Sequence, residues 1–507
     1  MRALSRIIFS AAVILLPFLS VSPAPAQEQP VAGDSLVESS IGDARILIPF
    51  LADDSASSDI CGRIFNGLVK YDKDLNLVGD LARSWEVSSD YKTLTFHLRE
   101  GVRWQDGASC EAIFVPDPLT VVFRYREPYA PALSKLGMGV IPRHILEGKD
   151  LRKSVFARRP LGTGPYVFQE WRTDEYTILK ANPGYFEGRP FLDRWITRII
   201  PDQAVEYLEF ITGGVDLMSL TPHQYRFRSE SEPFRRTGVK YTYRTGAYSF
   251  IGYNLLDPLF QDVRVRRALG MAVNKRQIIE GVLLGLGEPV TGPFWKGTWA
   301  YNDAVPDLPY DPASGRALLK ECGWEDRDGD GVLEKDGRPF QFKLITNQGN
   351  KVREDTATIV QRQWAEVGVR AEVQVIAWPT FLSEFIDKKK FQAIILGWTM
   401  PVDPDPYNVW HSESSGEGEL NFISYRNPEV DELIIKGVRT FDQAERRKIY
   451  HRIHELIARD QPYTFLYTPH SLVAVNRRIR GIEPAPAGLS WNLIKWWVPQ
   501  GEQKYLY

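Results

Sequence analysis

The second half of the chain shows an alternation of two hydrophobic patterns. Short apolar runs typical of strands alternate with segments whose apolar residues recur at helical spacing. In chain order these are 341–346 (strand), 353–366 (helix, followed by Gly368 as a C-cap), 371–376 (strand), 379–388 (helix) and 391–396 (strand). Strands that alternate with helices favour a parallel sheet covered by helices. The pattern therefore predicts an α/β fold.

Two polar and aromatic loops follow strands of this predicted sheet. Residues 347–350 read Asn-Gln-Gly-Asn, and residues 397–412 read GWTMPVDPDPYNVWHS. In open parallel sheets, ligands bind beyond the carboxyl ends of the strands, where such loops converge. The alternative is that Pro404 and Pro406 only stiffen a surface loop.

Length and composition limit the class of protein. A chain of 507 residues is longer than one hydrophobic core supports, so at least two lobes are expected. Hydrophobic residues make up 43% and charged residues 25%, as in soluble globular proteins. The formal net charge of -2 gives no electrostatic reason to bind nucleic acid.

The N-terminus has the pattern of a secretory signal peptide. Arg2 and Arg6 precede an apolar run over 7–19, and Ala24-Pro25-Ala26 offers a small-residue cleavage site. We expect residues 1–26 to be removed, residues 27–40 to form a flexible lead, and the protein to be periplasmic. An uncleaved membrane anchor is the alternative, but the run is shorter than the roughly 20 residues that span a bilayer.

Several segments, in order along the chain, look like those of the family 5 extracellular solute-binding proteins, the peptide- and nickel-binding components of ABC importers. The resemblance is carried by ARSWEVSSD (82–90) and LTFHLREGVRWQDG (94–107), GTGPY (162–166), DVRVRRAL (262–269), GW (397–398) with DPDP (403–406), and DQPY (460–463). It covers almost the whole chain after the signal peptide.

The resemblance implies a two-lobed periplasmic-binding-protein-like clamp of type II, in the large cluster that carries an extra subdomain. It places lobe 1 at 41–254, lobe 2 at 255–470 and a C-terminal return to lobe 1 at 471–507, with crossovers near 251–254 and 471–476. It also implies a monomer without catalysis or cofactor that captures peptides between its lobes and delivers them to membrane permease subunits of an ABC transporter.

The predicted ligand contacts combine the two loops with the start of lobe 1. They are Trp398 (an apolar or stacking wall), Asp403 (an acceptor or a partner for a ligand amine), Asp405 and Tyr407 (loop supports or polar contacts), Asn347 and Asn350 (amide donors and acceptors), and Ser55, Ser57 and Ser58 (facing the cleft from lobe 1).

The sequence departs from the family pattern in two places. Only residues 108–126 stand where similar proteins carry a longer stretch, so the subdomain around 60–160 is expected to be shortened. Pro401 and Asn347 occupy positions where dipeptide binders of the family hold the ligand's two ends with an aspartate and an arginine. A buried ligand charge without a partner is costly, so longer peptides or uncharged ligands such as oligosaccharides are favoured over dipeptides.

The sequence was also searched for residues that could bind a metal ion. Asp326, Asp328, Asp330 and Glu334 copy part of a calcium loop, but its twelfth position is Gly337, which favours a tight hairpin or turn. His451 and His454 lie on a helix with an ordinary apolar stripe, so no metal is predicted. With only seven histidines and no cluster, nickel transport is disfavoured.

Two alternatives and the thiols complete the predictions. A secreted hydrolase would use Asp403 and Asp405 as an acid/base pair, although one loop rarely supplies both halves of such a pair. A carrier of haem or of a metal chelate is the alternative within the binding class. Cys61, Cys110 and Cys322 are expected to be buried and inert.

Overall fold

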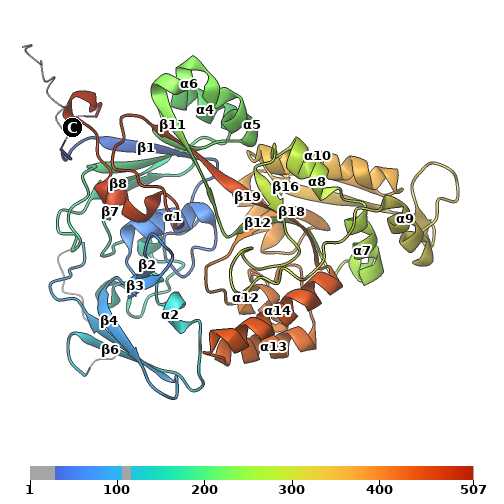
Figure 1. Ribbon diagram of the computed structural model, residues 1–507, viewed down its shortest axis with the longest axis horizontal. Coiled ribbons are helices and arrows are strands. Elements are labelled where there is room, and N and C mark those ends of the chain that lie inside the picture. The colour runs from blue at the N-terminus through green and yellow to red at the C-terminus, as the bar shows by residue number, and fades with distance from the viewer. Residues whose placement is uncertain (1–28, 106–115, 506–507) are drawn as a thin grey trace, which may run out of the picture.

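The computed structural model describes residues 29–105 and 116–505. The predicted signal peptide and Cys110 lie outside these residues. One twelve-stranded sheet runs through the described part of the protein, in the order β17-β16-β18-β12-β19-β10-β1-β9-β8-β7, with β11 and β13 also paired to β19 (Figure 1). The two ends of this sheet form two lobes, and the predicted two-lobed α/β fold is confirmed.

Lobe 1 contains the β1 end of the sheet. Its strands are β1 (Ser35–Ser40), β7 (Tyr166–Arg172), β8 (Tyr176–Ala181), β9 (Arg194–Ile199), β10 (Leu217–Ser219) and β11 (Gly238–Arg244). Its helices are α1 (Ser55–Ile64), α3 (Arg143–Leu146), α4 (Gln203–Thr212), α5 (Pro222–Arg226) and α6 (Glu232–Thr237). Residues 35–40, predicted as part of a flexible lead, instead form β1, which pairs in parallel with β9 and buries Leu36 and Val37.

Lobe 2 contains the β17 end of the sheet. Its strands are β12 (Ala247–Tyr253), β13 (Gly287–Pro289), β16 (Gln341–Asn347), β17 (Arg370–Ile376) and β18 (Ala393–Thr399). Its helices are α7 (Val263–Met271), α8 (Lys275–Gly281), α9 (Pro312–Glu321), α10 (Lys351–Glu366), α11 (Trp378–Thr380), α12 (Tyr407–Trp410), α13 (Pro428–Arg439) and α14 (Gln443–Asp460). The three predicted strands are confirmed as β16, β17 and β18, with both neighbours of β16 parallel to it.

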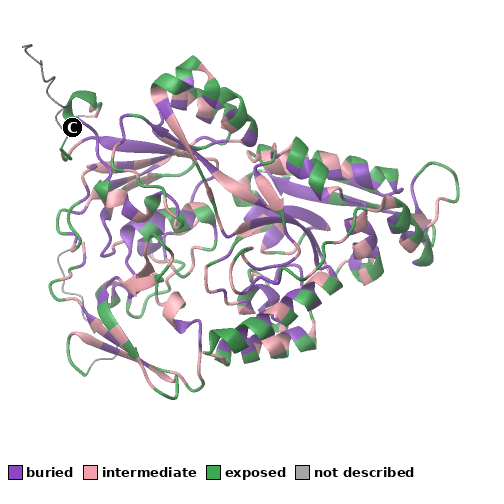
Figure 2. Cartoon of the chain, viewed as in Figure 1, coloured by how far each residue is buried: buried purple, intermediate pink, exposed green. Residues whose placement is uncertain are grey.

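The predicted helices of lobe 2 are present with altered ends. Asn350 caps α10 by accepting a hydrogen bond from the backbone N of Arg353, so this helix begins at Lys351. The segment predicted as a helix at 379–388 is the short α11 followed by a π-helical turn over Phe381–Ile386. Strand interiors are buried and the outer faces of the helices are exposed, as expected for a sheet between helical layers (Figure 2).

Strand β19 (Tyr463–Asn476) joins the two lobes. It pairs with β12 and β13 up to Pro469, and with β11 from His470 onward. Because β12 pairs with β18 along its whole length, the first crossing between the lobes lies at residues 245–246, ahead of the crossover expected at 251–254. The described chain thus passes between the lobes at residues 245–246 and within β19, an arrangement typical of proteins that close by a hinge.

A small subdomain extends lobe 1 toward α13 and α14 (Figure 1). It contains the hairpin β2 (Val69–Tyr71) and β3 (Leu77–Gly79), the three-stranded sheet β4 (Ala82–Val87), β5 (Thr93–Leu98) and β6 (Thr120–Arg124), and helix α2 (Ala132–Lys135). Leu94, Phe96 and Val121 are buried in a core of its own. The described part of the short segment 108–126 thus supplies β6, which completes the sheet.

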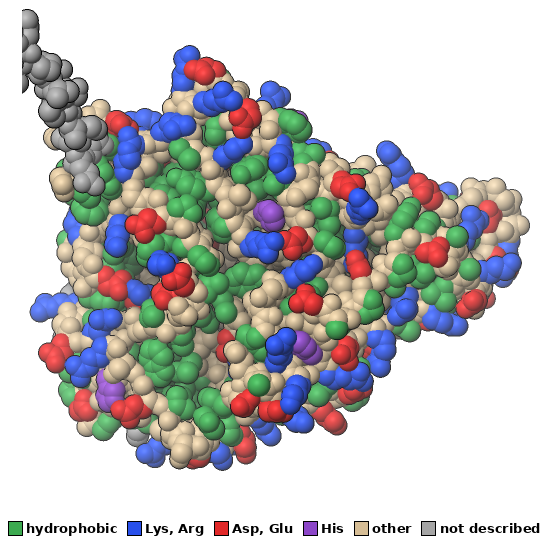
Figure 3. Space-filling view, viewed as in Figure 1, with side chains coloured by type: hydrophobic (Ala, Val, Ile, Leu, Met, Phe, Trp, Pro, Cys, Tyr) green, Lys and Arg blue, Asp and Glu red, His purple; other side chains and the backbone are tan. Residues whose placement is uncertain are grey.

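No helix among the described residues is long and apolar enough to cross a membrane. Lys, Arg, Asp and Glu side chains are interspersed over the face shown in Figure 3, without a patch of one sign. This face offers no basic surface of the kind that binds nucleic acid.

Candidate functional site

A cavity of about 750 Å³ lies between the lobes. Lobe 1 lines it with the start of α1 and residues 219–222, and lobe 2 lines it with the start of α10 and the end of β18. The cavity therefore sits at the carboxyl end of a parallel-sheet strand, where the fold favours ligand binding.

Four of the predicted contact residues line this cavity: Trp398, Asn350, Ser55 and Ser58. Trp398 stacks on Phe422 with ring centroids 5.7 Å apart, and its indole N–H donates to Tyr463 Oη at 3.3 Å. These contacts hold the indole in place as part of the cavity wall. Ser58 Oγ donates to the carbonyl of Ala52 at 2.9 Å.

Ser57 does not face the cleft, which corrects its predicted role. Its side chain is fully buried, and its hydroxyl donates to Asp54 Oδ2 at 2.6 Å while accepting from the backbone N of Arg45 at 2.9 Å. Asp54 is the N-cap of α1, so Ser57 belongs to the capping structure of that helix.

Asp403, Asp405 and Tyr407 do not line the cavity. Asp403 accepts from Arg446 at 2.7 Å, and Asp405 accepts from Tyr129 Oη at 2.6 Å with Lys135 Nζ at 2.8 Å. Tyr407 Oη donates to Glu413 at 2.8 Å. Each of these side chains is occupied by protein partners, so the structure gives no support to the two aspartates as a ligand contact or as an acid/base pair.

Asn347 acts on the cavity only through Arg353. It is 1% exposed, and its amide oxygen accepts from Arg353 Nη1 at 2.7 Å. Arg353 lines the cavity, and among the described residues no carboxylate lies within ion-pair distance of its guanidinium. Burial lowers the pKa of Arg353 to about 10, so the guanidinium stays charged at neutral pH.

Asp59 offers the opposite charge from lobe 1. Its side chain is exposed to the cavity, and among the described residues it forms no ion pair. The protein atoms crowded around it still raise the pKa of Asp59 to about 6, against the lowering effect of Arg63. The cavity thus presents a cation and an anion that form no ion pair with each other or with another described residue.

Two residues of the cavity wall, Tyr248 and His470, each carry a buried polar atom without a protein partner. Tyr248 Oη and His470 Nε2 are buried and accept or donate no hydrogen bond to any described residue. Tyr248 is only 2% exposed. An unpaired buried polar group costs about 1–3 kcal/mol, so a ligand that satisfies these atoms gains that amount on binding.

Arg353, Asp59, Tyr248 and His470 were not among the ligand contacts predicted from the sequence. Tyr248 and His470 stand in strands whose pattern indicates a core, and Arg353 is one of several charged residues along a helix. For Tyr248 and His470, the signal in the sequence is a polar side chain within a mostly apolar strand close to the junction of the lobes.

The lobes touch each other around the cavity. Arg45 Nη2 of lobe 1 lies 2.7 Å from Asp387 Oδ2 of lobe 2, and the backbone N of Lys351 donates to Gln203 Oε1 at 3.1 Å. On the subdomain side, the pairs of Tyr129 and Lys135 with Asp405 also cross from lobe to lobe. The two lobes are therefore in direct contact on both sides of the cavity.

The predicted calcium-like loop contains a hairpin. Carboxylate oxygens of Asp326, Asp328, Asp330 and Glu334 lie within 4.8 Å of one another. Two oxygens of Asp326 accept from the backbone N of Gly329 and of Gly331. The next residues form the strands β14 (Glu334–Lys335) and β15 (Arg338–Pro339), so the position of the missing twelfth ligand is the hairpin turn.

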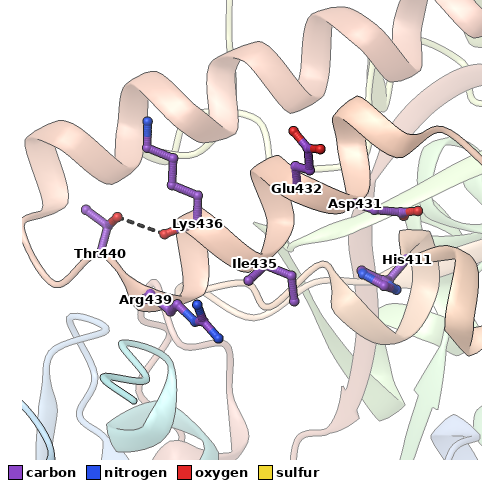
Figure 4. Close-up of a pocket in the computed structure, with 7 residues that line it drawn as sticks. All are labelled: His411, Asp431, Glu432, Ile435, Lys436, Arg439 and Thr440. Carbon is purple, nitrogen blue, oxygen red and sulfur yellow. Dashed lines mark hydrogen bonds between the residues drawn. The ribbon is translucent and has the colours of Figure 1, made fainter.

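His454, Cys61 and Cys322, which the sequence raised as candidates for other chemistry, lie in the protein interior. His454 is fully buried and accepts from the backbone N of Asn302 at Nδ1, and burial lowers its pKa to about 3. Cys61 and Cys322 are buried free thiols. Another pocket, of about 510 Å³, lies within lobe 2 and is lined by His411, Asp431, Glu432, Ile435, Lys436, Arg439 and Thr440 (Figure 4).

A cavity enclosed by two hinged lobes is the arrangement of a solute-binding protein. The family described as "Bacterial extracellular solute-binding proteins, family 5 Middle" matches residues 76–113 and 108–419, and this chain belongs to that family. The two matched segments meet at the place where the subdomain was expected to be shortened.

Individual relatives agree with this assignment. The chain is 31% identical to "Oligopeptide-binding protein AppA" of Bacillus subtilis, with 98% of this chain and 99% of that protein covered. The solved structure of that protein with a nonapeptide has a TM-score of 0.87 at 30% identity, covering 93% of this chain and 100% of the other. NikZ from Campylobacter jejuni in complex with Ni(L-His) gives a TM-score of 0.83 at 25% identity, covering 91% and 99%.

Proposed function

We propose that this protein captures peptides between its two lobes in the periplasm and delivers them intact to membrane permease subunits of an ABC transporter. The observation that carries this proposal is the cavity between the lobes, which is lined by Arg353 and Asp59, neither of them in an ion pair, and by Tyr248 and His470, whose side chains each carry a polar atom without a protein partner. The similarity to an oligopeptide-binding protein supports the peptide as the class of ligand.

The cavity suits the chemistry of a peptide. An extended peptide offers backbone donors and acceptors along its length, which Tyr248 Oη and His470 Nε2 can satisfy. A ligand carboxylate pairs with Arg353, and an ammonium group or a basic side chain pairs with Asp59. Trp398 supplies an apolar wall for side chains.

Binding is coupled to closure of the lobes. A ligand that contacts α1 and the start of α10 at once binds the closed form more tightly than the open form, and therefore shifts the population toward closure. The cross-lobe contacts of Asp405 and Arg45 stabilise the same closed form. When the lobes open again, the peptide is released to the permease chemically unchanged.

Substitution of Tyr248 by phenylalanine tests the proposed site. We expect Tyr248→Phe to weaken binding of a randomised nonapeptide library about tenfold, by about 1.4 kcal/mol, because the ligand loses a hydrogen bond. The free energy of unfolding of the free protein should stay equal or rise, since an unpaired hydroxyl is removed. Calorimetric titration and urea unfolding give the two quantities.

Tyr253→Phe is the matched control, because this buried tyrosine of the same strand already bonds Thr464 Oγ1 at 2.8 Å. The control should lose about 1 kcal/mol of stability and keep its affinity for peptides. Unchanged affinity in Tyr248→Phe would remove Tyr248 from the site.

Asp405→Asn tests the contribution of the cross-lobe contacts to closure. Loss of the ion pair with Lys135 should favour the open form and raise the radius of gyration of the free protein in small-angle X-ray scattering. Peptide affinity should fall about threefold, since partly exposed ion pairs contribute about 1 kcal/mol or less. The control Asp150→Asn removes an exposed carboxylate that pairs within lobe 1, and identical scattering of both variants would contradict this role of Asp405.

Analysis of the bound ligand distinguishes the proposal from its alternatives. Peptides added to the protein should be recovered at full mass after denaturation. Cleaved peptides would support a hydrolase, whereas recovery of glycans, haem or a metal chelate in place of peptides would identify another ligand class.

A further inference from the structure

Carboxylates outnumber guanidinium groups in the wall of the ligand cavity. Among the described residues that line it, the positively charged side chains of Lys and Arg are represented by Arg45 and Arg353. The carboxylates come from both lobes and are Asp53, Asp54 and Asp59 of lobe 1 with Asp387 and Glu419 of lobe 2. The cavity wall therefore carries an excess of negative charge.

Arg45 is already shared by two of these carboxylates. Its Nη2 lies 2.7 Å from Asp387 Oδ2, and its Nη1 lies 3.7 Å from Asp53 Oδ1. Burial raises the pKa of Asp53, and the nearby charges of Asp54 and Asp387 act in the same direction against Arg45. Like charges crowded into one cavity have this effect, and a cation bound among them relieves it.

Asp59 and Glu419 are the carboxylates that a ligand meets without displacing a protein cation. Both residues are exposed, and among the described residues neither forms an ion pair. The charges of Arg63 and Lys389 act on them, but these two side chains bond other groups and do not line the cavity. A free carboxylate is thus offered from each lobe.

The carboxylates of the cavity are too dispersed to hold one metal ion together. Among the described residues, the acidic group at 326–334 is the one that brings three or more possible ligand atoms within 4.8 Å of one another. Dispersed carboxylates suit separate organic cations. Trp378 and Trp398 line the same cavity, and the faces of such rings also attract ammonium and guanidinium groups.

We propose that the cavity selects basic peptides, and that Asp59 and Glu419 are the specificity-determining residues that pair with Lys or Arg side chains of the ligand. This proposal rests on the proposed function of the cavity. Arg353 remains available for a ligand carboxylate, so a peptide with more positive than negative groups complements the charges of the wall. An acidic side chain next to Asp59 or Glu419 meets a like charge, which disfavours binding.

Competition between peptides of equal length tests this selectivity. The protein is mixed with equal concentrations of three hexapeptide pools, which carry two Lys, two Gln or two Glu residues at varied positions among Ala, Ser and Val. Peptides retained after gel filtration are measured by mass spectrometry. The wild type should retain the Lys pool about tenfold over the Gln pool, and the Glu pool least of all.

The double variant Asp59→Asn, Glu419→Gln should bring the ratio of retained Lys pool to Gln pool down to about one, and each single variant should lower it about threefold. The double variant Asp150→Asn, Glu417→Gln is the matched control. It removes the same two charges from exposed residues of the two lobes that do not line the cavity, so it should keep the wild-type ratio.

The possible failures are distinguishable. Equal retention of the three pools by the wild type, or an unchanged ratio in the variants of Asp59 and Glu419, would overturn the selectivity and leave capture of peptides standing. If the double variant retains no peptide, the ratios of the two single variants decide. If the wild type retains no pool, the proposed function fails as well.

Discussion

Replacement of Arg353 by glutamine is expected to weaken binding of randomised nonapeptides about a hundredfold, a loss of about 2.7 kcal/mol. Arg353 lines the cavity, and no carboxylate of the described residues pairs with it. Removal of one partner from a buried, hydrogen-bonded charge pair costs about 2–5 kcal/mol or more, because the other charge is left unpaired. A ligand carboxylate would be that other charge.

The same substitution should not destabilise the free protein strongly. Among the described residues, the Arg353 side chain bonds the amide of Asn347, and a shorter uncharged side chain also relieves the burial of a cation. Arg362→Gln, on the same helix but not in the cavity wall, is the control and should bind peptides as the wild type does. Equal affinities of Arg353→Gln and the wild type would show that no ligand anion sits there.

Acidification is expected to destabilise the protein through His454. The pKa of this histidine falls from 6.5 to about 3 because of burial, and its Nδ1 must stay unprotonated to accept from the backbone N of Asn302. The unfolded state therefore binds more protons between these values, so stability is fully present above pH 6.5 and is lost as the pH falls toward 3. The full loss is roughly 5 kcal/mol at about 1.4 kcal/mol per pH unit.

Comparison with His454→Asn isolates this effect. Asparagine retains an acceptor and does not titrate, whereas Asp59 and Glu206, whose pKa values are raised to about 6 and about 7, act in the opposite sense in both proteins. Urea unfolding at several values between pH 7.5 and 4 should show a steeper fall for the wild type, by about 1.4 kcal/mol per unit below pH 6. Parallel curves would contradict a buried neutral histidine.

Local periodicity predicted much of lobe 2. Strand β16 alternates polar and apolar residues at its start and β18 begins with an apolar run, so the sequences of both indicate strands. Strand β1 was not predicted, because only Leu36 and Val37 in it are apolar and its partners β9 and β10 are distant in the chain. A short parallel strand depends on those partners more than on its own composition.

The candidate site was predictable only in part. The strand-end rule located Trp398 and Asn350 on the cavity wall. Asp403 and Asp405, predicted by the same rule, do not line the cavity. Their partners Arg446, Tyr129 and Lys135 come from distant segments. Which polar atoms remain without a partner depends on the complete packing, and this is why Tyr248 and His470 emerged only from the structure.

Hydrogen–deuterium exchange with and without the peptides of a tryptic casein digest tests the central claim most directly. Binding between the lobes should slow exchange at the same time in α1 of lobe 1 and at the start of α10 and the end of β18 in lobe 2. Protection restricted to one lobe, or no protection at saturating peptide, would contradict capture of a peptide by closure of two lobes.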